Sequence, residues 1–525
     1  MAFAAIKNVK KRFREHFAIG QKSASTRLPP APARTVLALA VLSGILLVAL
    51  RPLQAQTKSM LYSFNNETGD GDSPMAGLTM DSKGNFYGTT MFGGSYGDGT
   101  VFKVTPTGSE TVLYSFTDIG VDGSTPTGGL VMDKRGNLYG TTTSGGANGE
   151  GTVFKLTPDG AETVLYSFCS EPMCADGYYP VAGLIMDSKR NFYGTTIYGG
   201  ADGAGAVFKL TSVGPETVLF SFCLNMNCST GASPYAGLMM DSAGNLYGTT
   251  AYGGAKTEGI VFELSPGGTE TVLYSFGSAP GDGATPYTDP IMDKEGTLYG
   301  TTVNGGASGM GTVFELAPGG VETVLYSFGS TPGDGTTPYV GLIMDKEGNL
   351  YGTTRSGGAA NYGAVFELSP PDKVGGAWTE TVFTSFMGSD GSYPYGRLIM
   401  DKEKNLYGTT SGGGPDGLGT VFKISASSTT TELSSSPNPS DSGQRVTLTA
   451  VVTGASVTTP TGKVTFKNGT TTLGTAKLKA SGTATATATL KTSKLPVGSD
   501  SLTAVYGGNS WNVTSTSAPL IQVVN

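Results

Sequence analysis

Apolar and polar residues alternate in four short segments that recur together seven times between Leu61 and Ile424. Typical copies read GLTMD, NLYGTT, GTVFKL and ETVLYSF, and such alternation over five to seven residues is typical of half-buried β-strands. One tyrosine per repeat measures the period, which is 52 to 56 residues. These tyrosines are Tyr87, Tyr139, Tyr193, Tyr247, Tyr299, Tyr351 and Tyr407. A period near fifty with four strands per unit predicts an all-β fold, a seven-bladed β-propeller with one blade per repeat.

The two ends of the repeat array predict how the propeller closes. The array begins with a fourth-type segment, Leu61–Phe64, and ends after a third-type segment, Val421–Ile424. The first strand therefore completes the last blade, which leaves no loose sheet edge between the first and last blades. The alternative is an unclosed array in which the ETVLYSF segment is the first strand of each blade. We assign residues 56–428 to the propeller.

Loop lengths distinguish two sides of the blades. The turns after GLTMD and most of those after GTVFKL are short, whereas the other two connections are long and rich in glycine. Both long connections emerge on the same side of a four-stranded antiparallel blade. Because binding residues concentrate on loops held by a rigid scaffold, we expect the functional site on this side.

Four of the long loops carry a tyrosine directly after a proline. We predict that these tyrosines bind a ligand by stacking, and a carbohydrate or a peptide would suit them. The alternative is that the rings pack between blades, since large aromatic side chains bury well there. The residues are Tyr235, Tyr287, Tyr339 and Tyr395.

Aspartates recur in the same loops, each close to a glycine. Carboxylates and loop carbonyls are the ligands that Ca²⁺ prefers, so these residues form a candidate calcium site, although none matches the twelve-residue EF-hand pattern. No other cofactor is expected. The candidate metal ligands are Asp72, Asp122, Asp282, Asp334 and Asp390. A second aspartate set, exemplified by Asp81 in DSKGN, follows each GLTMD segment, and we interpret it as turn-forming rather than as a calcium ring.

The four cysteines lie in two neighbouring loops, CSEPMC and CLNMNC. Four cysteines in an exported chain indicate two disulfides. We favour the local pairs Cys169–Cys174 and Cys223–Cys228, while two other connectivities remain open.

The N-terminal 55 residues predict export. A basic stretch precedes an apolar run, Thr35–Leu50, and Leu53–Ala55 provides a signal-peptide cleavage site. The alternative is an uncleaved membrane anchor. We expect a monomer that is secreted or exposed at the cell surface, with no membrane attachment after cleavage.

Charge and histidine content exclude several functions. The net charge is −7, and it becomes −15 without residues 1–55, which hold nine Lys or Arg and one Glu. Such an acidic chain repels phosphate backbones, so nucleic acid is excluded as a partner. The single histidine, His16, lies in the predicted signal, which excludes histidine-based catalysis and histidine metal sites from the exported part.

Residues 429–525 differ in composition, being rich in Thr, Ser, Ala and Val with few acidic residues. Short alternating segments separated by turns predict a β-sandwich. The phrases PTGKVTFKNGTTTLGTAKL and LTAVYGGNSWNVTSTSAP closely resemble bacterial Ig-like repeat domains, which implies a spacer or adhesive module.

The repeat itself also resembles a known family. NFYGTT at 85–90, GTVFK at 99–103 and ETVLYSF at 110–116 are similar to the Gloeobacter–Verrucomicrobia repeat, found in tandem in exported bacterial proteins. The resemblance covers Leu61–Ile424 and implies export but no particular reaction. We predict a non-catalytic protein that binds or adheres to an extracellular ligand, a glycan or a protein. The alternatives are a polysaccharide hydrolase or lyase using a carboxylate or tyrosine, and a structural cell-surface protein.

Overall fold

The computed structural model describes residues 58–211, 215–223, 227–371, 375–455, 459–482, 484–509 and 512–525. The predicted export signal, residues 1–55, lies outside this part of the chain. Among the described residues, no helix is both long enough and apolar enough to span a membrane.

Each repeat forms a four-stranded antiparallel sheet, as the alternating pattern predicts. The first strands, from the GLTMD segments, are β3 (Thr79–Met80), β9 (Val131–Met132), β14 (Ile185–Met186), β18 (Met239–Met240), β23 (Ile291–Met292), β29 (Ile343–Met344) and β34 (Ile399–Met400). The second strands are β4 (Phe86–Thr90), β10 (Leu138–Thr142), β15 (Phe192–Thr196), β19 (Leu246–Thr250), β24 (Leu298–Thr302), β30 (Leu350–Thr354) and β35 (Leu406–Thr410).

The remaining strands complete the seven sheets. The third strands are β6 (Thr100–Val104), β12 (Thr152–Leu156), β16 (Ala206–Leu210), β20 (Ile260–Leu264), β26 (Thr312–Ala317), β32 (Ala364–Ser369) and β36 (Thr420–Ile424). The fourth strands are β7 (Glu110–Ser115), β13 (Glu162–Ser167), β17 (Glu216–Ser221), β21 (Glu270–Ser275), β27 (Val321–Ser327), β33 (Thr379–Ser385) and, from the N-terminus, β1 (Lys58–Ser63).

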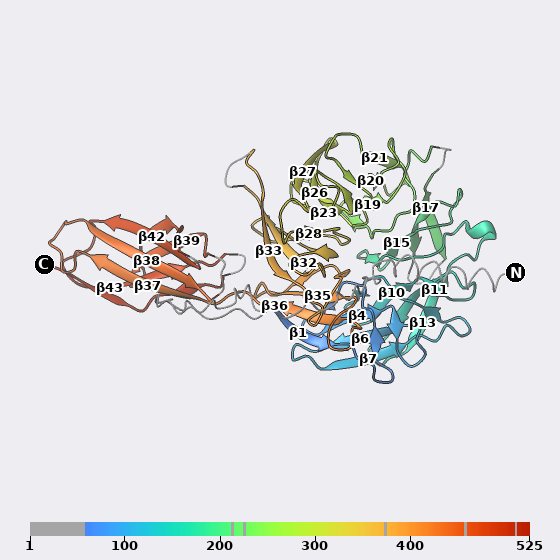
Figure 1. Cartoon of the computed structure of the whole chain (residues 1–525), viewed down its shortest axis with the longest axis horizontal. Coiled ribbons are helices and arrows are strands. Elements are labelled where there is room, and N and C mark those ends of the chain that lie inside the picture. The colour runs from blue at the N-terminus through green and yellow to red at the C-terminus, as the bar shows by residue number, and fades with distance from the viewer. Residues whose placement is uncertain are drawn as a thin grey trace, which may run out of the picture. The chain divides into compact units, whose positions relative to one another are not determined.

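The N-terminal strand β1 completes the sheet formed by the last repeat. It pairs with β36 in antiparallel register, with Lys58 opposite Ile424 and Ser63 opposite Thr420 (Figure 1). A register shift between Met60 and Tyr62 reproduces the bulge found between the third and fourth strands of the other sheets, for example opposite Val101 and Phe102. The ETVLYSF segment is therefore the last strand of each sheet, and the alternative reading of it as the first strand is wrong.

Consecutive sheets are joined by a repeated hydrogen bond. The Oγ1 of Thr89 donates to the carbonyl oxygen of Gly128 in the next repeat at 3.2 Å. The same bond joins the last repeat to the first, because Thr409 Oγ1 donates to the Ala76 carbonyl at 2.9 Å. The rings of Phe86 and Tyr407 also lie 4.4 Å apart between these two repeats. The first and last sheets therefore contact each other as neighbouring sheets do.

Two-residue strands connect the long loops within a repeat. β2 (Gly71–Asp72) pairs with β5 (Phe92–Gly93), so the loop before the first strand lies beside the loop after the second strand. We call this edge of the sheets the long-loop side. Equivalent pairs are β8 (Gly123–Ser124) with β11 (Ser144–Gly145), β22 (Gly283–Ala284) with β25 (Asn304–Gly305), and β28 (Gly335–Thr336) with β31 (Ser356–Gly357).

The C-terminal region forms two further sheets. Their strands are β37 (Thr429–Ser436), β38 (Val446–Gly454), β39 (Lys463–Asn468), β40 (Thr471–Lys477), β41 (Lys479–Gly482), β42 (Thr485–Thr492), β43 (Gly498–Tyr506), β44 (Ser515–Thr516) and β45 (Leu520–Val524). The sheets have the orders β37-β38-β42-β41 and β40-β39-β43-β44, with β45 also paired to β43. Leu448, Phe466, Leu502 and Tyr506 are fully buried in their common core.

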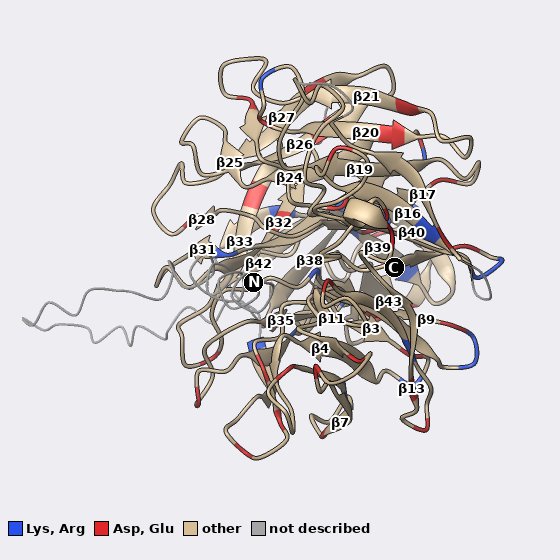
Figure 2. Ribbon diagram, turned by 90° about the vertical axis from the view of Figure 1, so that its right-hand side faces the viewer, with Lys and Arg blue, Asp and Glu red and all other residues tan. Residues whose placement is uncertain are grey.

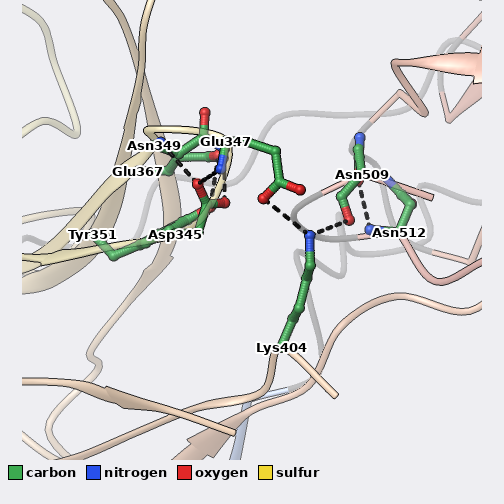
Figure 3. A network of polar contacts seen from close by, with 8 residues as sticks. All are labelled: Asp345, Glu347, Asn349, Tyr351, Glu367, Lys404, Asn509 and Asn512. Carbon is green, nitrogen blue, oxygen red and sulfur yellow. Dashed lines mark hydrogen bonds and ion pairs between the residues drawn. The ribbon is translucent and has the colours of Figure 1, made fainter. Parts of the chain in front are cut away.

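The aspartates that follow the first strands form turns, as interpreted from the sequence. In Figure 3, Asp345 accepts hydrogen bonds from the backbone amides of Glu347 and Asn349, at 3.0 and 2.9 Å, and from the Asn349 side chain at 2.8 Å. The hydroxyl of Tyr351 also donates to Asp345, at 2.9 Å. One carboxylate thus joins the turn to the following strand.

Six of the fourth strands carry, at their first or second position, a glutamate whose Oε1 atom is buried and has no hydrogen-bond partner among the described residues. Burial raises the pKa of Glu216 to about 8, and the carboxylate of Asp176, in the long loop before β14, contributes. Burial likewise raises the pKa of the other five to about 7; they are Glu110, Glu162, Glu270, Glu322 and Glu380. In β1 this position holds Lys58, whose Nζ pairs with Asp390 at 2.7 Å.

These glutamates predict a loss of stability at alkaline pH. A carboxyl group stabilises the fold when its pKa in the folded state lies above 4.5, its ordinary value. This stabilisation is complete below pH 4.5 and is lost as the pH rises through 7 to 8, the pKa range of these glutamates in the folded protein. We expect the melting temperature to fall by about 5 °C between pH 5 and pH 8.5. Scanning calorimetry across this range measures the slope, and E216Q with E322Q should flatten it. A melting temperature that rises over this interval would contradict the assignment.

Candidate functional site

The loop geometry on the long-loop side is fixed by a strained residue that directly precedes the proline recurring in each repeat. Thr285 precedes Pro286 with φ +57°, a conformation that β-branched residues rarely adopt. Its amide donates to the Glu258 carbonyl at 2.8 Å, and its own carbonyl accepts from the Val303 amide at 3.2 Å. These backbone hydrogen bonds from two repeats hold the strained residue. The direction in which the following tyrosine leaves the loop is therefore set by the scaffold.

Each of these prolines packs closely against a glycine of the preceding repeat. A Cβ added to Gly259 would lie 2.6 Å from Cδ of Pro286, and the residue has φ +97°. Only glycine allows this approach without displacement. The equivalent contact at Gly419 receives Pro74 of the first repeat.

The structure brings the four predicted tyrosines into one continuous row, which we call the tyrosine row. The ring centroids of Tyr235 and Tyr287 are 4.7 Å apart, those of Tyr287 and Tyr339 are 5.5 Å apart, and those of Tyr339 and Tyr395 are 5.4 Å apart. Each ring comes from a different repeat. Such tilted and edge-on contacts are favourable for aromatic pairs, so the row is a pre-arranged aromatic surface.

The rings of the row are partly exposed and their hydroxyls remain neutral. All four side chains are half-buried, and two more exposed tyrosines lie nearby, Tyr198 and Tyr252. The Tyr252 and Tyr287 hydroxyls are 3.4 Å apart. Burial raises the pKa of Tyr287 well above its ordinary range, and the neighbouring tyrosine hydroxyls add to the shift. The row therefore offers ring faces and neutral hydroxyl groups at physiological pH.

A single arginine lies at one end of the row. The guanidinium carbon of Arg355 lies 5.7, 5.5 and 5.4 Å from the ring centroids of Tyr339, Tyr393 and Tyr395. Its Nε atom is buried and has no hydrogen-bond partner among the described residues. The cation is thus held by aromatic faces, with its charge uncompensated by any carboxylate within ion-pair distance in the described part of the chain.

A partly exposed ion pair lies two residues beyond the row along the chain. Arg397 Nη1 donates to Asp289 Oδ2 at 2.9 Å, and Arg397 Nε donates to the Leu342 carbonyl at 3.1 Å. Asp289 and Arg397 follow Tyr287 and Tyr395 in the loops that lead into the first strands. A Cβ on Gly341 would lie 2.8 Å from Asp289 Oδ1, so the pair passes close to the intervening repeat.

The candidate calcium ligands lie in separate repeats and have local partners. Asp122, Asp282 and Asp334 accept hydrogen bonds from tyrosine hydroxyls at 2.9 to 3.0 Å. Asp390 pairs with Lys58, and Asp72 accepts from the Ser73 hydroxyl at 2.8 Å. Acidic residues lie on many separate loops in Figure 2, and the described residues contain no group of three or more acidic, cysteine or histidine residues placed to hold a metal ion.

Both predicted disulfides are present. Cys169 is bonded to Cys174 and Cys223 to Cys228, so the local pairing is confirmed. Each bond closes a loop on the long-loop side. The first loop contains the short 3₁₀ helix η1 (Pro172–Cys174), and Met173 at its tip is 94 % exposed.

Sequence reasoning missed Arg355, Asp289 and Arg397 as site residues. A comparison of the repeats with one another contains the signal. The position of Arg355 holds Met91, Thr143, Ile197, Ala251, Val303 and Ser411 in the other repeats. Asp289 and Arg397 occupy the same position in two different repeats. The other five repeats have glycine at this position, namely Gly77, Gly129, Gly183, Gly237 and Gly341. Departures from the repeat, rather than its regular residues, mark these three charges.

The fold and the site define a class: an all-β tandem-repeat protein whose long loops present an aromatic surface. The sequence model of the Gloeobacter/Verrucomicrobia repeat matches residues 46–174, 173–293 and 278–476. The chain belongs to this family. Residues 433–525 match the bacterial Ig-like domain, group 3. No curated protein matches the sequence.

Several solved structures are distantly similar to the chain. A lectin from Burkholderia pseudomallei has a TM-score of 0.43 at 10 % identity, covering 68 % of this chain and 97 % of the lectin. A protein of unknown function from Bacteroides thetaiotaomicron has a TM-score of 0.36 at 12 % identity, covering 72 % and 98 %. An ulvan lyase, a polysaccharide lyase bound to a GlcA–Rha3S saccharide, has a TM-score of 0.30 at 8 % identity, covering 88 % and 98 %.

Proposed function

We propose that the chain is an exported, non-catalytic binding protein that recognises an extracellular glycan through the tyrosine row. The observation that carries this proposal is the row itself: four half-buried tyrosines from four repeats form one continuous aromatic surface. Sugar rings present C–H groups that stack on aromatic faces, while their hydroxyls accept or donate hydrogen bonds to tyrosine. A ligand that spans several rings, as an oligosaccharide does, matches this arrangement.

The proposal includes a closed seven-bladed propeller as the scaffold. It is supported by the β1–β36 pairing and by the hydrogen bond from Thr409 to Ala76, which repeats the bond found between other sheets. Closure would leave no free edge strand between the first and last sheets. The tyrosine row would then lie around one mouth of the central channel.

Export is supported by the two disulfides and by the Ig-like domain, because disulfides persist in oxidising compartments. An extracytoplasmic location would give the tyrosine row access to cell-surface or environmental polysaccharides. The Ig-like domain would serve as a spacer or adhesive module. We propose a monomer without nucleic-acid partners.

The proposal is tested by a screen of immobilised glycans and polysaccharides with the purified full chain, in calcium and again in EDTA. We expect saturable binding that a soluble form of the same glycan competes. Loss of binding in EDTA would establish the calcium role predicted for the aspartate loops. Release of shortened saccharides from a bound polysaccharide would establish the hydrolase or lyase alternative instead, and absence of binding throughout would overturn glycan recognition.

A further inference from the structure

We propose that the tyrosine row takes an anionic saccharide, with Arg355 binding its carboxylate or sulfate group. This inference rests on the proposed glycan binding and adds the chemical class of the ligand. It starts from one charge: Arg355 is the only basic residue at its position among the seven repeats.

The surroundings of Arg355 use only part of its hydrogen-bonding capacity, because the hydroxyl oxygen of Tyr395 is the one side-chain acceptor shown for its guanidinium among the described residues. Three tyrosine rings, Tyr339, Tyr393 and Tyr395, lie within 5.4 to 5.7 Å of its central carbon. Aromatic faces stabilise the cation without using all of its N–H donors, and its Nε is buried with no hydrogen-bond partner among the described residues. Arg355 as a whole is half-buried, so a ligand oxygen would accept from the N–H donors of the guanidinium other than the buried Nε.

The other arginine near the row is already occupied. Arg397 forms an ion pair with Asp289 at 2.9 Å and a hydrogen bond with the Leu342 carbonyl. No equivalent carboxylate lies within ion-pair distance of Arg355 among the residues that the structure describes. Of these two arginines, Arg355 is therefore the one whose charge a ligand would complement.

The planar guanidinium forms paired hydrogen bonds with carboxylate and sulfate oxygens. At the end of the tyrosine row, this geometry places an acidic group beside a surface on which sugar rings stack. General attraction of a polyanion by the protein does not account for such binding, because the chain is acidic, with a net charge of −7. Selective binding of an anionic saccharide would thus depend on this local group.

The test compares three probes with the full chain by isothermal titration: an oligogalacturonate, the same oligomer after carboxyl reduction, and a sulfated galactan oligomer. We expect at least one acidic probe to bind roughly tenfold or more tightly than the neutral one, with added salt reducing the difference. Binding of the uronate or of the sulfate alone identifies which anionic group is recognised. The R355M variant should remove this preference, and R355K should restore part of it.

The R135M variant is the matched control, because Arg135 is an exposed arginine in the short turn between β9 and β10. Because the readout is the ratio of affinities for acidic and neutral probes, moderate destabilisation of a variant does not change its meaning. Equal affinities for all three probes would overturn the anionic assignment, and a preference that survives R355M would overturn the role of Arg355; both results would leave glycan binding intact. Failure of the wild-type chain to bind any glycan would overturn the proposed function as well.

Discussion

The F64A variant is expected to lose about 3–5 kcal/mol of unfolding free energy, as much as a core phenylalanine in the middle of the array. Phe64 follows β1 and is fully buried. Its ring lies 5.1 Å from Phe102 of the first repeat, although β1 itself belongs to the sheet of the last repeat. The side chain therefore joins the two ends of the array, and its removal would leave a cavity there.

Phe116 provides a matched control. It is equally buried and lies 5.2 Å from Phe154 in the next repeat, so its environment repeats that of Phe64 away from the ends. Urea unfolding of F64A and F116A compares the two losses directly. Equal losses of unfolding free energy are expected if the propeller is closed as proposed. A much smaller loss for F64A would contradict closure, because a frayed end has little burial to lose.

The second large effect concerns binding: Y287A with Y339A should weaken the affinity for a bound glycan by about a hundredfold, since truncation of an interface tyrosine commonly costs 1–2 kcal/mol. These two rings occupy the centre of the tyrosine row, so a ligand that spans the row contacts both. Titration of the glycan identified in the screen measures the loss.

The Y96A variant controls for this change. Tyr96 is 61 % exposed and lies in a long loop of the first repeat, outside the tyrosine row. Its removal should leave the affinity unchanged. If the double variant instead keeps its affinity and loses much of its thermal stability, the rings act in packing between repeats, as the alternative reading of the sequence holds.

The strands and their order could be predicted because each residue type recurs at the same place in every repeat. The alternation in ETVLYSF and GTVFKL indicates one buried face, and the displaced first strand predicted the pairing of β1 with β36, which is confirmed. The two disulfides were predictable because each pair of cysteines lies in one loop. The two-residue ladders such as β2–β5 were not, because glycine-rich segments carry no alternation of side chains.

The aspartates show why site chemistry is harder to predict than strands. Asp122 accepts hydrogen bonds from the Tyr114 hydroxyl and from the Thr117 amide of its own loop. The spacing of residues in the sequence does not identify these contacts. The connection from the third to the fourth repeat holds a clue, because Phe220 stands in place of the tyrosine and Thr230 in place of the aspartate. In the first repeat the equivalent residue is Asp70, whose carboxylate accepts from the Tyr62 hydroxyl at 2.8 Å, whereas Asp72 accepts from the Ser73 hydroxyl.

Charges that depart from the repeat also required the structure. Asp289 and Arg397 are 108 positions apart and meet only because loops of different repeats approach one another. The tyrosine rings that surround the Arg355 guanidinium come from more than one repeat. Contacts of this kind depend on how the sheets follow one another in space, which the period alone does not specify.

Hydrogen–deuterium exchange of the full chain, with and without the glycan that binds it, tests the central claim most directly. We expect protection of the loops around Tyr235, Tyr287, Tyr339 and Tyr395, with no change in β37–β45 of the Ig-like domain. Protection confined to the Ig-like strands, with the tyrosine row unaffected, would contradict the account and would place recognition in the C-terminal domain.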